Sequence, residues 1–239
     1  MAETIIELKR VTRSYRRGSE TVSALQDFDL QVPVGAFRAI MGPSGSGKST
    51  LLNLVGGLDR PDAGNVVVDG AELTGMSPAQ LSRFRADRIG VIFQAFNLIS
   101  VLTALQNVEL PLLLHSLGRA RRREQALRAL KLVGMDDRIH HRPAQLSGGQ
   151  EQRVAVARAF ATDPKVILAD EPTGELDRHA ADSILDLLVL LNQEFGKTIL
   201  MVTHDPRAAE RAGAVIHLDK GQVDRIVPRE PVSEQPAGR

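Results

Sequence analysis

Residues 37–55 have the sequence FRAIMGPSGSGKSTLLNLV, in which an apolar run, a glycine-rich turn and a helical pattern follow one another directly. The run at 37–41 carries a single charge and predicts a short strand, and the apolar spacing after Thr50 predicts a helix. The turn fits G-x-x-x-x-G-K-[ST], whose glycines let backbone N–H groups point inward around an anion. Because the helix amino terminus adds partial positive charge there, we predict a phosphate-binding loop.

The side chains of this loop suit a nucleoside triphosphate with Mg²⁺. Lys48 is placed to reach the β- and γ-phosphates, and Ser49 is placed to ligate the metal. The alternative is a glycine-rich turn that binds nothing, and the predicted strand and helix on either side argue against it. The residues expected to contact nucleotide here are Gly42, Ser44, Gly45, Ser46, Gly47, Lys48, Ser49 and Thr50.

Length and composition exclude several classes of protein. A chain of 239 residues can form one large α/β domain or two small ones. Its 30 basic and 29 acidic side chains give a net charge of +1, so we expect no nucleic-acid partner. The absence of cysteine excludes disulfides and thiolate zinc sites and fits a reducing compartment. Without a secretory signal, or an apolar run near the roughly 20 residues that span a bilayer, the chain is expected to be cytosolic.

Short apolar runs alternate with longer periodic segments along the chain, which favours a parallel sheet covered by helices, the α/β class. The runs at 166–169 and 198–203 end in DEP and HDP, where open α/β sheets place their ligands. Residues 178–195 predict a helix, because apolar side chains recur at three- and four-residue steps before a glycine. The runs 66–68 and 214–218, each followed by turn residues, predict hairpin arms that add antiparallel strands at an edge.

Two further segments differ in composition from the rest. Residues 102–133 have a helical pattern but are far more basic, and we interpret them as a separate helical lobe. Their arginines at 119 and 121–123 are most simply a solvated helix face, because the net charge gives no support to a nucleic-acid footprint. Residues 228–239 are too poor in apolar side chains to order themselves. We expect one folded domain at 1–227 and a disordered tail at 228–239.

Asp170 and Glu171 are adjacent at the end of a predicted strand, so their side chains leave on opposite sides of the backbone. Asp170 suits the shell of a Mg²⁺ ion. Glu171 can orient, or accept a proton from, the water that attacks the γ-phosphorus. Taken alone, such a pair is more often a solvated strand exit, but the phosphate loop in the same chain reverses this preference.

The sequence LSGGQ at 146–150 precedes a predicted helix of small residues at 152–161. Ser147 with Gln150 three residues later fits a capping box, which alone could explain these residue types. Gly148 and Gly149 nevertheless leave N–H groups unobstructed at a helix amino terminus. The segment therefore predicts a second anion site.

Together these motifs resemble those of ATP-binding-cassette (ABC) transporter ATPases. The phosphate loop, LSGGQ, ADEP at 169–172 and VTHD at 202–205 occur in the family's order, and the likeness covers about residues 4–226. The stretches 41–50, GGLDRP at 56–61 and FQAFNL at 93–98 look most like the ATPases of lipoprotein-release, macrolide-export and cell-division systems. The resemblance implies a P-loop NTPase (RecA-like) core with an antiparallel β edge and an α-helical subdomain inserted at about residues 96–160.

The resemblance also implies roles at matching positions. Tyr15 would stack on adenine, with an ordinary strand aromatic as the alternative. Gln94 would meet Mg²⁺ and the attacking water, and His204 would contact the γ-phosphate, although a histidine at a strand end is otherwise more often a surface residue. Asp177 would lie in a loop that crosses a dimer interface. The implied catalytic residues are Lys48, Gln94, Glu171 and His204, and the implied metal ligands are Ser49, Gln94 and Asp170.

The partners follow from the same resemblance. In this family the LSGGQ residues Ser147, Gly148, Gly149 and Gln150 serve the nucleotide held by the other copy, which implies a head-to-tail dimer, here a homodimer, with two ATP molecules and Mg²⁺. An integral membrane permease is the second implied partner. The chain would lie at the cytoplasmic face of a bacterial inner membrane without inserting into it, and would couple ATP hydrolysis to transport or mechanical work.

Other members of the family offer alternatives. DNA-repair and chromosome ATPases insert coiled coils or cysteine-based zinc modules between the motifs, and translation-type relatives usually carry two cassettes; this sequence has one phosphate loop and neither insertion. A mainly structural coupling subunit with slow turnover is a further alternative. The presence of Glu171 and His204 argues against an inactive site but not against slow hydrolysis.

Two positions depart from the family pattern. Glu151 stands where relatives usually have glutamine, and Glu175 stands where this subgroup usually has asparagine. We hypothesise that Glu175 weakens an ATP-bound dimer or disfavours ionisation of Glu171, because like charges near one site oppose ionisation. The alternative is a solvent-facing side chain without effect.

Overall fold

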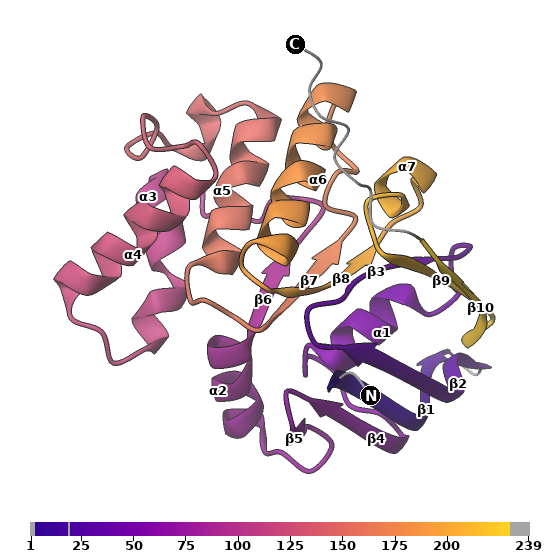
Figure 1. The fold of residues 1–239 in the computed structure, drawn as a ribbon. Helices are drawn as coiled ribbons and strands as arrows, with labels where there is room; N and C mark the ends of the chain where they lie inside the picture. The colour runs from indigo at the N-terminus through magenta and orange to yellow at the C-terminus, as the bar shows by residue number, and fades with distance from the viewer. Residues whose placement is uncertain (1–2, 19, 230–239) are drawn as a thin grey trace.

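The computed structural model describes residues 3–18 and 20–229, which form two sheets and a layer of helices (Figure 1). The first sheet is antiparallel, with strand order β2-β1-β4-β5. Its strands are β1 (Thr4–Arg17), β2 (Glu20–Pro33), β4 (Ala63–Val68) and β5 (Ala71–Glu72). The second sheet has the order β10-β9-β3-β8-β7-β6. Its strands are β3 (Phe37–Met41), β6 (Ile89–Ile92), β7 (Val166–Asp170), β8 (Thr198–Val202), β9 (Ala214–Asp219) and β10 (Gln222–Pro228).

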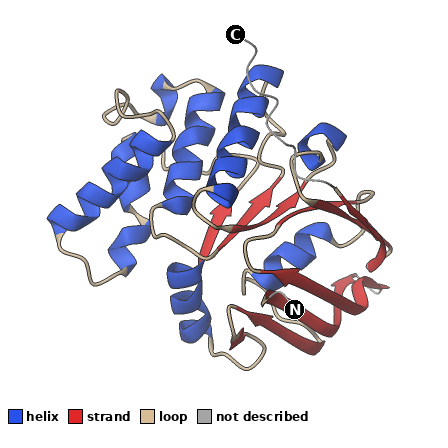
Figure 2. Cartoon of the chain, viewed as in Figure 1, coloured by secondary structure: helices blue, strands red, loops and turns tan. Residues whose placement is uncertain are grey.

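Helices cover the second sheet, as the blue ribbons of Figure 2 show. They are α1 (Lys48–Val55), α2 (Pro78–Arg88), α3 (Ala104–Glu109), α4 (Arg119–Leu132), α5 (Gly148–Phe160), α6 (Arg178–Gln193) and α7 (Pro206–Ala209), with 3₁₀ turns η1 (Pro111–Leu114) and η2 (Pro143–Gln145). In the second sheet every neighbouring pair is parallel except β9–β10. The predicted α/β class is therefore confirmed.

The second sheet separates two hydrophobic cores, which explains why its inner strands β7 and β8 are almost entirely apolar. Val166 and Leu168 of β7 pack in the core shared with α1 and the antiparallel sheet. Ile167 and Ala169 pack on the other side, in the core shared with α3, α4, α5 and α6. Because successive side chains of a strand point to opposite faces, a parallel sheet covered on both faces needs apolar residues at every position.

The basic segment at 102–133 is helical, as predicted, but it is divided into α3, η1 and α4. Helix α5 contacts both α3 and α4, and it also contacts β6 of the second sheet. It begins at Gly148, earlier than the predicted residue 152, because Ser147 caps it directly. The helical layer is thus joined to the sheet through α5.

The structure corrects three boundaries. Helix α6 ends at Gln193, and Phe195 lies beyond it, 43% exposed, with its ring edge-on to Phe160 at 5.2 Å. The antiparallel strands do not share one edge: β4 belongs to the separate antiparallel sheet, and β9 runs parallel to β3, so only β10 is an antiparallel edge of the second sheet. Pro228, which we assigned to the tail, pairs with Ala214 at the end of β10; residues 230–239 lie outside the described residues.

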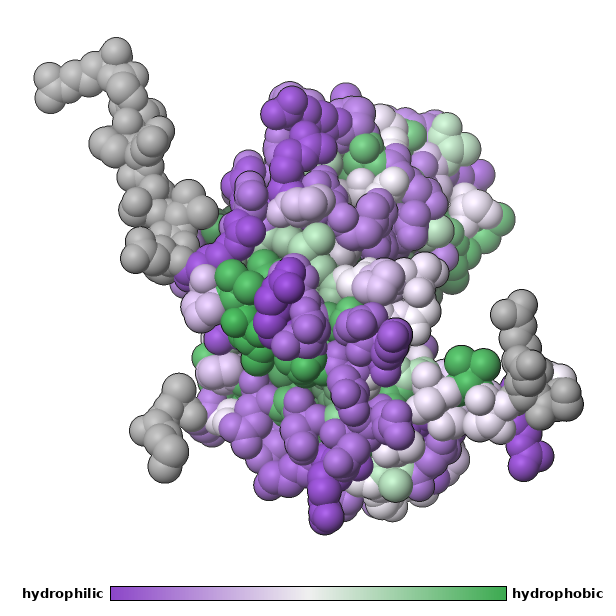
Figure 3. Space-filling view, turned by 90° about the vertical axis from the view of Figure 1, so that its right-hand side faces the viewer, coloured by the Kyte–Doolittle hydropathy of each residue, from purple (hydrophilic) through white to green (hydrophobic). Residues whose placement is uncertain are grey.

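None of the described helices has the length and apolar character needed to cross a bilayer. The face in Figure 3 is largely hydrophilic, with apolar residues gathered to the left of its middle and smaller apolar groups toward its right-hand edge.

Candidate functional site

The loop between β3 and α1 is held tightly against the antiparallel sheet. Gly47 has φ 99°, and a Cβ there would lie 2.4 Å from the backbone oxygen of Ala24 in β2, so no side chain fits. Helix α1 begins at Lys48 with no side-chain acceptor at its N-cap. Its first N–H groups are therefore available to an anion, as the sequence predicted.

Two polar side chains of this loop are held inside it. The Nζ of Lys48 donates to the backbone oxygens of Gly42 and Pro43 at 2.8 and 2.9 Å. Ser46 is 2% exposed, and its Oγ is buried without a hydrogen-bond partner among the described atoms. The Ser46 side chain is thus packed under the loop, and the predicted contact of Ser46 with nucleotide stays a prediction.

A pocket of about 600 Å³ opens over the loop and gathers most of the predicted site residues. Those that line it are Tyr15, Gly42, Ser44, Gly45, Gly47, Lys48, Ser49, Thr50, Gln94, Asp170, Glu171 and His204. Val22, Ala24 and Val202 also line it and were missed. Val22 lines the pocket because it pairs with Tyr15 across β1 and β2. It was missed because no sequence motif marks an apolar residue on the neighbouring strand.

Glu171 and His204 form a direct pair at the carboxyl ends of β7 and β8. The ring Nδ1 of His204 lies 2.9 Å from Oε2 of Glu171, and the backbone N–H of His204 donates to the same oxygen at 3.3 Å. Glu171 has φ 48°, a left-handed conformation that is uncommon for a side-chain-bearing residue. The side chain of His204 is 74% exposed, while that of Glu171 is 17% exposed. The carboxylate therefore holds one nitrogen of the imidazole, and the rest of the ring extends toward solvent.

Asp170 lies deeper in the pocket, and its surroundings disfavour its charge. Burial raises the pKa of Asp170, the neighbouring Glu171 charge raises it further, and Lys48 opposes both effects. A bound cation would favour the carboxylate form. The oxygen donors of Ser49, Gln94 and Asp170 line the same pocket and suit Mg²⁺, which commonly takes one or two carboxylates and completes its shell with phosphate and water. These residues therefore fit a Mg²⁺–nucleotide complex.

The LSGGQ segment lies apart from this pocket. Ser147 Oγ accepts from the N–H of Gln150 at 3.3 Å, and Gln150 Oε1 accepts from the N–H of Ser147 at 3.0 Å, so the predicted capping box is confirmed. A Cβ on Gly149 would lie 3.0 Å from the Cβ of Ala180 in α6. Asp177 caps α6 by accepting from the N–H of Ala180 at 3.0 Å. None of Ser147, Gly148, Gly149, Gln150 or Asp177 lines the pocket.

Gln152, which the sequence reasoning missed, connects the two regions. It is fully buried on α5, and its Nε2 donates to the backbone oxygens of Phe93 and Pro172 at 3.1 and 2.5 Å. These residues adjoin Gln94 and Glu171. The only sequence signal was a polar residue on an otherwise apolar helix face.

The two departures from the family pattern differ in environment. Glu151 is half-buried in the first turn of α5, and burial raises the pKa of its carboxyl. Glu175 is exposed in the loop between β7 and α6. Its predicted effect on a dimer stays a prediction.

A glycine-rich loop between a strand and a helix, with a lysine and adjacent carboxylates facing one pocket, defines a P-loop nucleoside triphosphatase. A family profile described as ABC transporter matches residues 25–174. The chain is 48% identical over 225 residues to the uncharacterized ABC transporter ATP-binding protein MJ0796 of Methanocaldococcus jannaschii, with 92% of this chain and 96% of that protein covered.

Two further comparisons extend this finding. The macrolide export ATP-binding/permease protein MacB 1/2 of Paracoccus denitrificans is 47% identical over 226 residues, which cover 93% of this chain but 34% of that protein. A dimeric structure of MJ0796 in a post-hydrolysis state bound to ADP and Pi matches with a TM-score of 0.87 at 45% identity, covering 94% of this chain and 98% of that chain.

The chain therefore belongs to the ATP-binding proteins of the ABC transporter family. The expected P-loop NTPase fold is confirmed, and the protein is an ATPase whose substrate is ATP with Mg²⁺.

Proposed function

We propose that this protein works as a head-to-tail homodimer that hydrolyses ATP between its two subunits and drives a separate integral membrane permease. The described residues up to Pro228 belong to the ATP-binding domain, and the segment at about 96–160 is an inserted helical subdomain that presents LSGGQ. The observation that carries the proposal is the separation of the two anion-binding features, since the LSGGQ residues lie outside the pocket that holds Lys48, Asp170 and Glu171.

Each subunit supplies the nucleotide's main contacts through its own pocket. The N–H groups of the phosphate loop and the ammonium of Lys48 bind the phosphate chain, and Tyr15 stacks on the base. Ser49, Asp170 and Gln94 hold Mg²⁺, which offsets charge on the transferring phosphoryl group when it is bound. The buried Oγ of Ser46 helps to shape the loop from beneath.

Glu171 and His204 complete the hydrolytic site. The Glu171 carboxylate orients the attacking water and accepts its proton. Its contact with Nδ1 of His204 fixes the imidazole, so that Nε2 faces the γ-phosphate. The same contact keeps both side chains at the ends of neighbouring strands, where they act on one phosphoryl group.

The LSGGQ tip of one subunit closes over the nucleotide of the other. It offers N–H groups and a helix amino terminus, but it has no lysine and no metal ligand of its own, so it suits the outer side of a triphosphate that is already held. A dimeric structure is described for the relative MJ0796 with ADP and Pi bound.

The membrane partner is proposed from the relatives. MacB 1/2 is named an ATP-binding/permease protein, and the match covers 34% of its length. A permease encoded as a separate chain would supply the remaining function here. We place the complex in an export, lipoprotein-release or mechanotransmission system at the cytoplasmic face of a bacterial inner membrane.

Mixing two inactive variants tests the head-to-tail arrangement. Lys48→Ala disables the pocket. Gly148→Asp disables the tip, because it places a carboxylate where phosphate would bind, yet an acidic residue suits the first turn of a helix. A Cβ at Gly148 would meet only ordinary contacts at 3.6 Å and beyond, so the fold should hold, and Gly148→Ala serves as the size control.

Each mixed dimer would contain one pocket and one tip that are both intact and face each other. Phosphate release should therefore reappear when the two folded variants are mixed. If differently tagged chains are shown to associate with ATP and yet the mixture stays inactive, the arrangement across subunits is wrong.

A further inference from the structure

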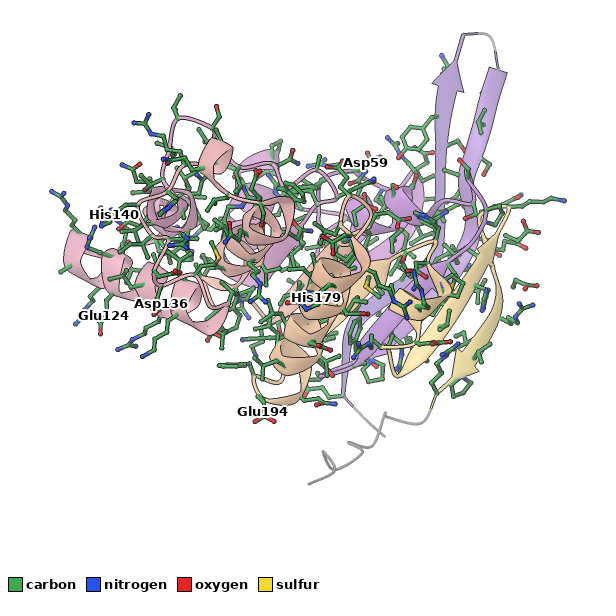
Figure 4. All side chains as sticks on the ribbon, turned by 90° about the horizontal axis from the view of Figure 1, so that it is seen from above. Asp59, Glu124, Asp136, His140, His179 and Glu194 are labelled. Carbon is green, nitrogen blue, oxygen red and sulfur yellow. The ribbon has the colours of Figure 1, made fainter. Side chains whose placement is uncertain are left out.

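We propose that Asp59, together with Arg13, is a positioning residue that holds the ring of Tyr15 in the orientation that receives the nucleotide base. The inference rests on the proposed role of Tyr15. It concerns a cluster on the loop after α1, a segment to which no chemistry has been assigned. Figure 4 labels Asp59 near the hairpin formed by β1 and β2.

Four hydrogen bonds converge on the Asp59 carboxylate, one of them from the backbone N–H of Arg60 at 2.7 Å and three from side chains. Arg13 donates to it through two nitrogens, from Nε to Oδ2 at 2.9 Å and from Nη2 to Oδ1 at 2.8 Å. The hydroxyl of Tyr15 donates to Oδ2 at 2.7 Å. A bidentate guanidinium–carboxylate pair fixes angle as well as distance, so the phenol oxygen meets an acceptor whose position is itself set.

Arg13 also fixes the face of the ring. Its guanidinium carbon lies 4.8 Å from the centroid of Tyr15, within the range of a cation–π contact. Asp59 therefore holds the tip of the ring, and Arg13 lies over the ring. Because Tyr15 also lines the pocket, its ring can be offered to a base as a flat apolar surface.

A second carboxylate fastens the backbone of the same segment. Asp62 accepts from Nη1 of Arg13 at 2.8 Å and from the N–H of Ser14 at 2.7 Å. Among the described residues Asp62 forms no hydrogen bond with the Tyr15 hydroxyl, which donates to Asp59. The two acids thus have different partners. Asp62 bonds the backbone of β1, whereas Asp59 alone among the described residues accepts the hydrogen bond of the Tyr15 hydroxyl.

The ionised form of Asp59 is favoured, which suits a residue that accepts hydrogen bonds from Tyr15 and Arg13. Burial alone would oppose its ionisation, but the hydrogen bonds from Tyr15, from the N–H of Arg60 and from Arg13 outweigh burial and keep the pKa of Asp59 below its ordinary value. The side chains of Arg13 and Asp59 are each 23% exposed. An exposed ion pair would contribute little, but a partly buried bidentate pair with a third donor specifies geometry.

The test separates the base end of the nucleotide from the phosphate end. We would measure kcat and KM for ATP, and the inhibition constant of inorganic tripolyphosphate, in Asp59→Asn and Tyr15→Phe. Each variant should raise KM for ATP about three- to tenfold, the worth of one hydrogen bond, with kcat unchanged. The tripolyphosphate constant should not change, and the double variant should be no worse than either single one.

Asp186→Asn is the matched control, because Asp186 accepts from Arg211 at 2.7 Å on α6 without lining the pocket. It should leave all three constants unchanged. If Asp59→Asn weakens tripolyphosphate as much as ATP, or lowers kcat, Asp59 only supports the fold and the inference is overturned.

Tyr15→Ala distinguishes this inference from the function on which it rests. If Tyr15→Ala leaves KM for ATP unchanged, the stacking role of Tyr15 is wrong. If Tyr15→Ala raises KM but Asp59→Asn and Tyr15→Phe do not, stacking stands and the positioning role of Asp59 fails.

Discussion

The phosphate loop and the LSGGQ tip are both glycine-rich starts of helices, but they differ in how those helices begin. Helix α1 starts behind Gly47 with no side-chain acceptor, so its first N–H groups can be given to an anion. Helix α5 brings its own acceptor, Ser147, and is already capped. The phosphate loop is also surrounded by the lysine and acids of its own chain. The phosphate loop is therefore a nearly complete site, whereas the LSGGQ tip is a surface that contributes to a site held elsewhere.

The chemistry should depend most strongly on the phosphate-loop side. Glu171→Gln should lower steady-state phosphate release by roughly 10²–10⁴-fold, the usual worth of a positioned base, while ATP binding by calorimetry is retained. Glu194→Gln, the same change at an exposed side chain outside the pocket, controls for the loss of one negative charge. Near-normal turnover in Glu171→Gln would remove the role that we give this carboxylate.

Two glycines of the phosphate loop test how much its packing against β2 contributes to ATP binding and stability. Gly47→Ala should cost more than 2 kcal/mol of unfolding free energy and abolish ATP binding, because a left-handed φ and a 2.4 Å collision with Ala24 combine there. Gly45 has φ 81°, but a Cβ there would meet no neighbour within 4 Å. Gly45→Ala should therefore lower the unfolding free energy only by its backbone strain, about 1–2 kcal/mol. Chemical denaturation measures both. Equal losses would mean that packing against β2 is unimportant.

The buried amide of Gln152 tests whether the two regions act separately. Gln152→Leu removes both hydrogen bonds and leaves the Phe93 and Pro172 carbonyls buried, which should cost about 1–3 kcal/mol of unfolding free energy and reduce turnover. Gln193→Leu, on the exposed end of α6, is the control and should change neither. If Gln152→Leu loses stability but keeps full turnover, the residue is structural and does not connect the regions.

The smallest effect is expected at the tip itself. Ser147→Ala removes the N-cap of α5 and should lower the unfolding free energy by about 1 kcal/mol. Binding of ATP to the isolated subunit should not change, because Ser147 lies outside the pocket. Calorimetry on dilute protein checks this. A clear loss of affinity there would place the tip in its own subunit's site and contradict the comparison.

What could be predicted from the sequence is what is local in the chain. The strands β3, β7 and β8 and the pocket residues that follow them were found because each run carries its functional loop within a few residues. The capping box of α5 was found for the same reason. Helix α2 was missed because only Leu81 and Phe84 are buried on it, which is too few for a visible helical period.

Contacts between distant residues left no such signal. The bonds from Arg13 to Asp59 span 46 positions, and nothing in either local pattern favours the other. The strands β1 and β2 mix charged with apolar residues and contain register shifts, so their alternation is irregular. Gln152 was missed because the carbonyls that it bonds belong to two other loops.

The close approach of Ala24 to Gly47 also bears on how the subunit can move. The same Ala24 oxygen would lie 2.7 Å from a Cβ on Gly221, in the turn between β9 and β10, so one peptide of β2 lies against two glycines, one in the phosphate loop and one in that turn. The antiparallel sheet therefore cannot rotate without displacing that turn and the phosphate loop together. The part of the pocket that would receive adenine and the part that would receive the triphosphate are thus tied to each other through one peptide of β2.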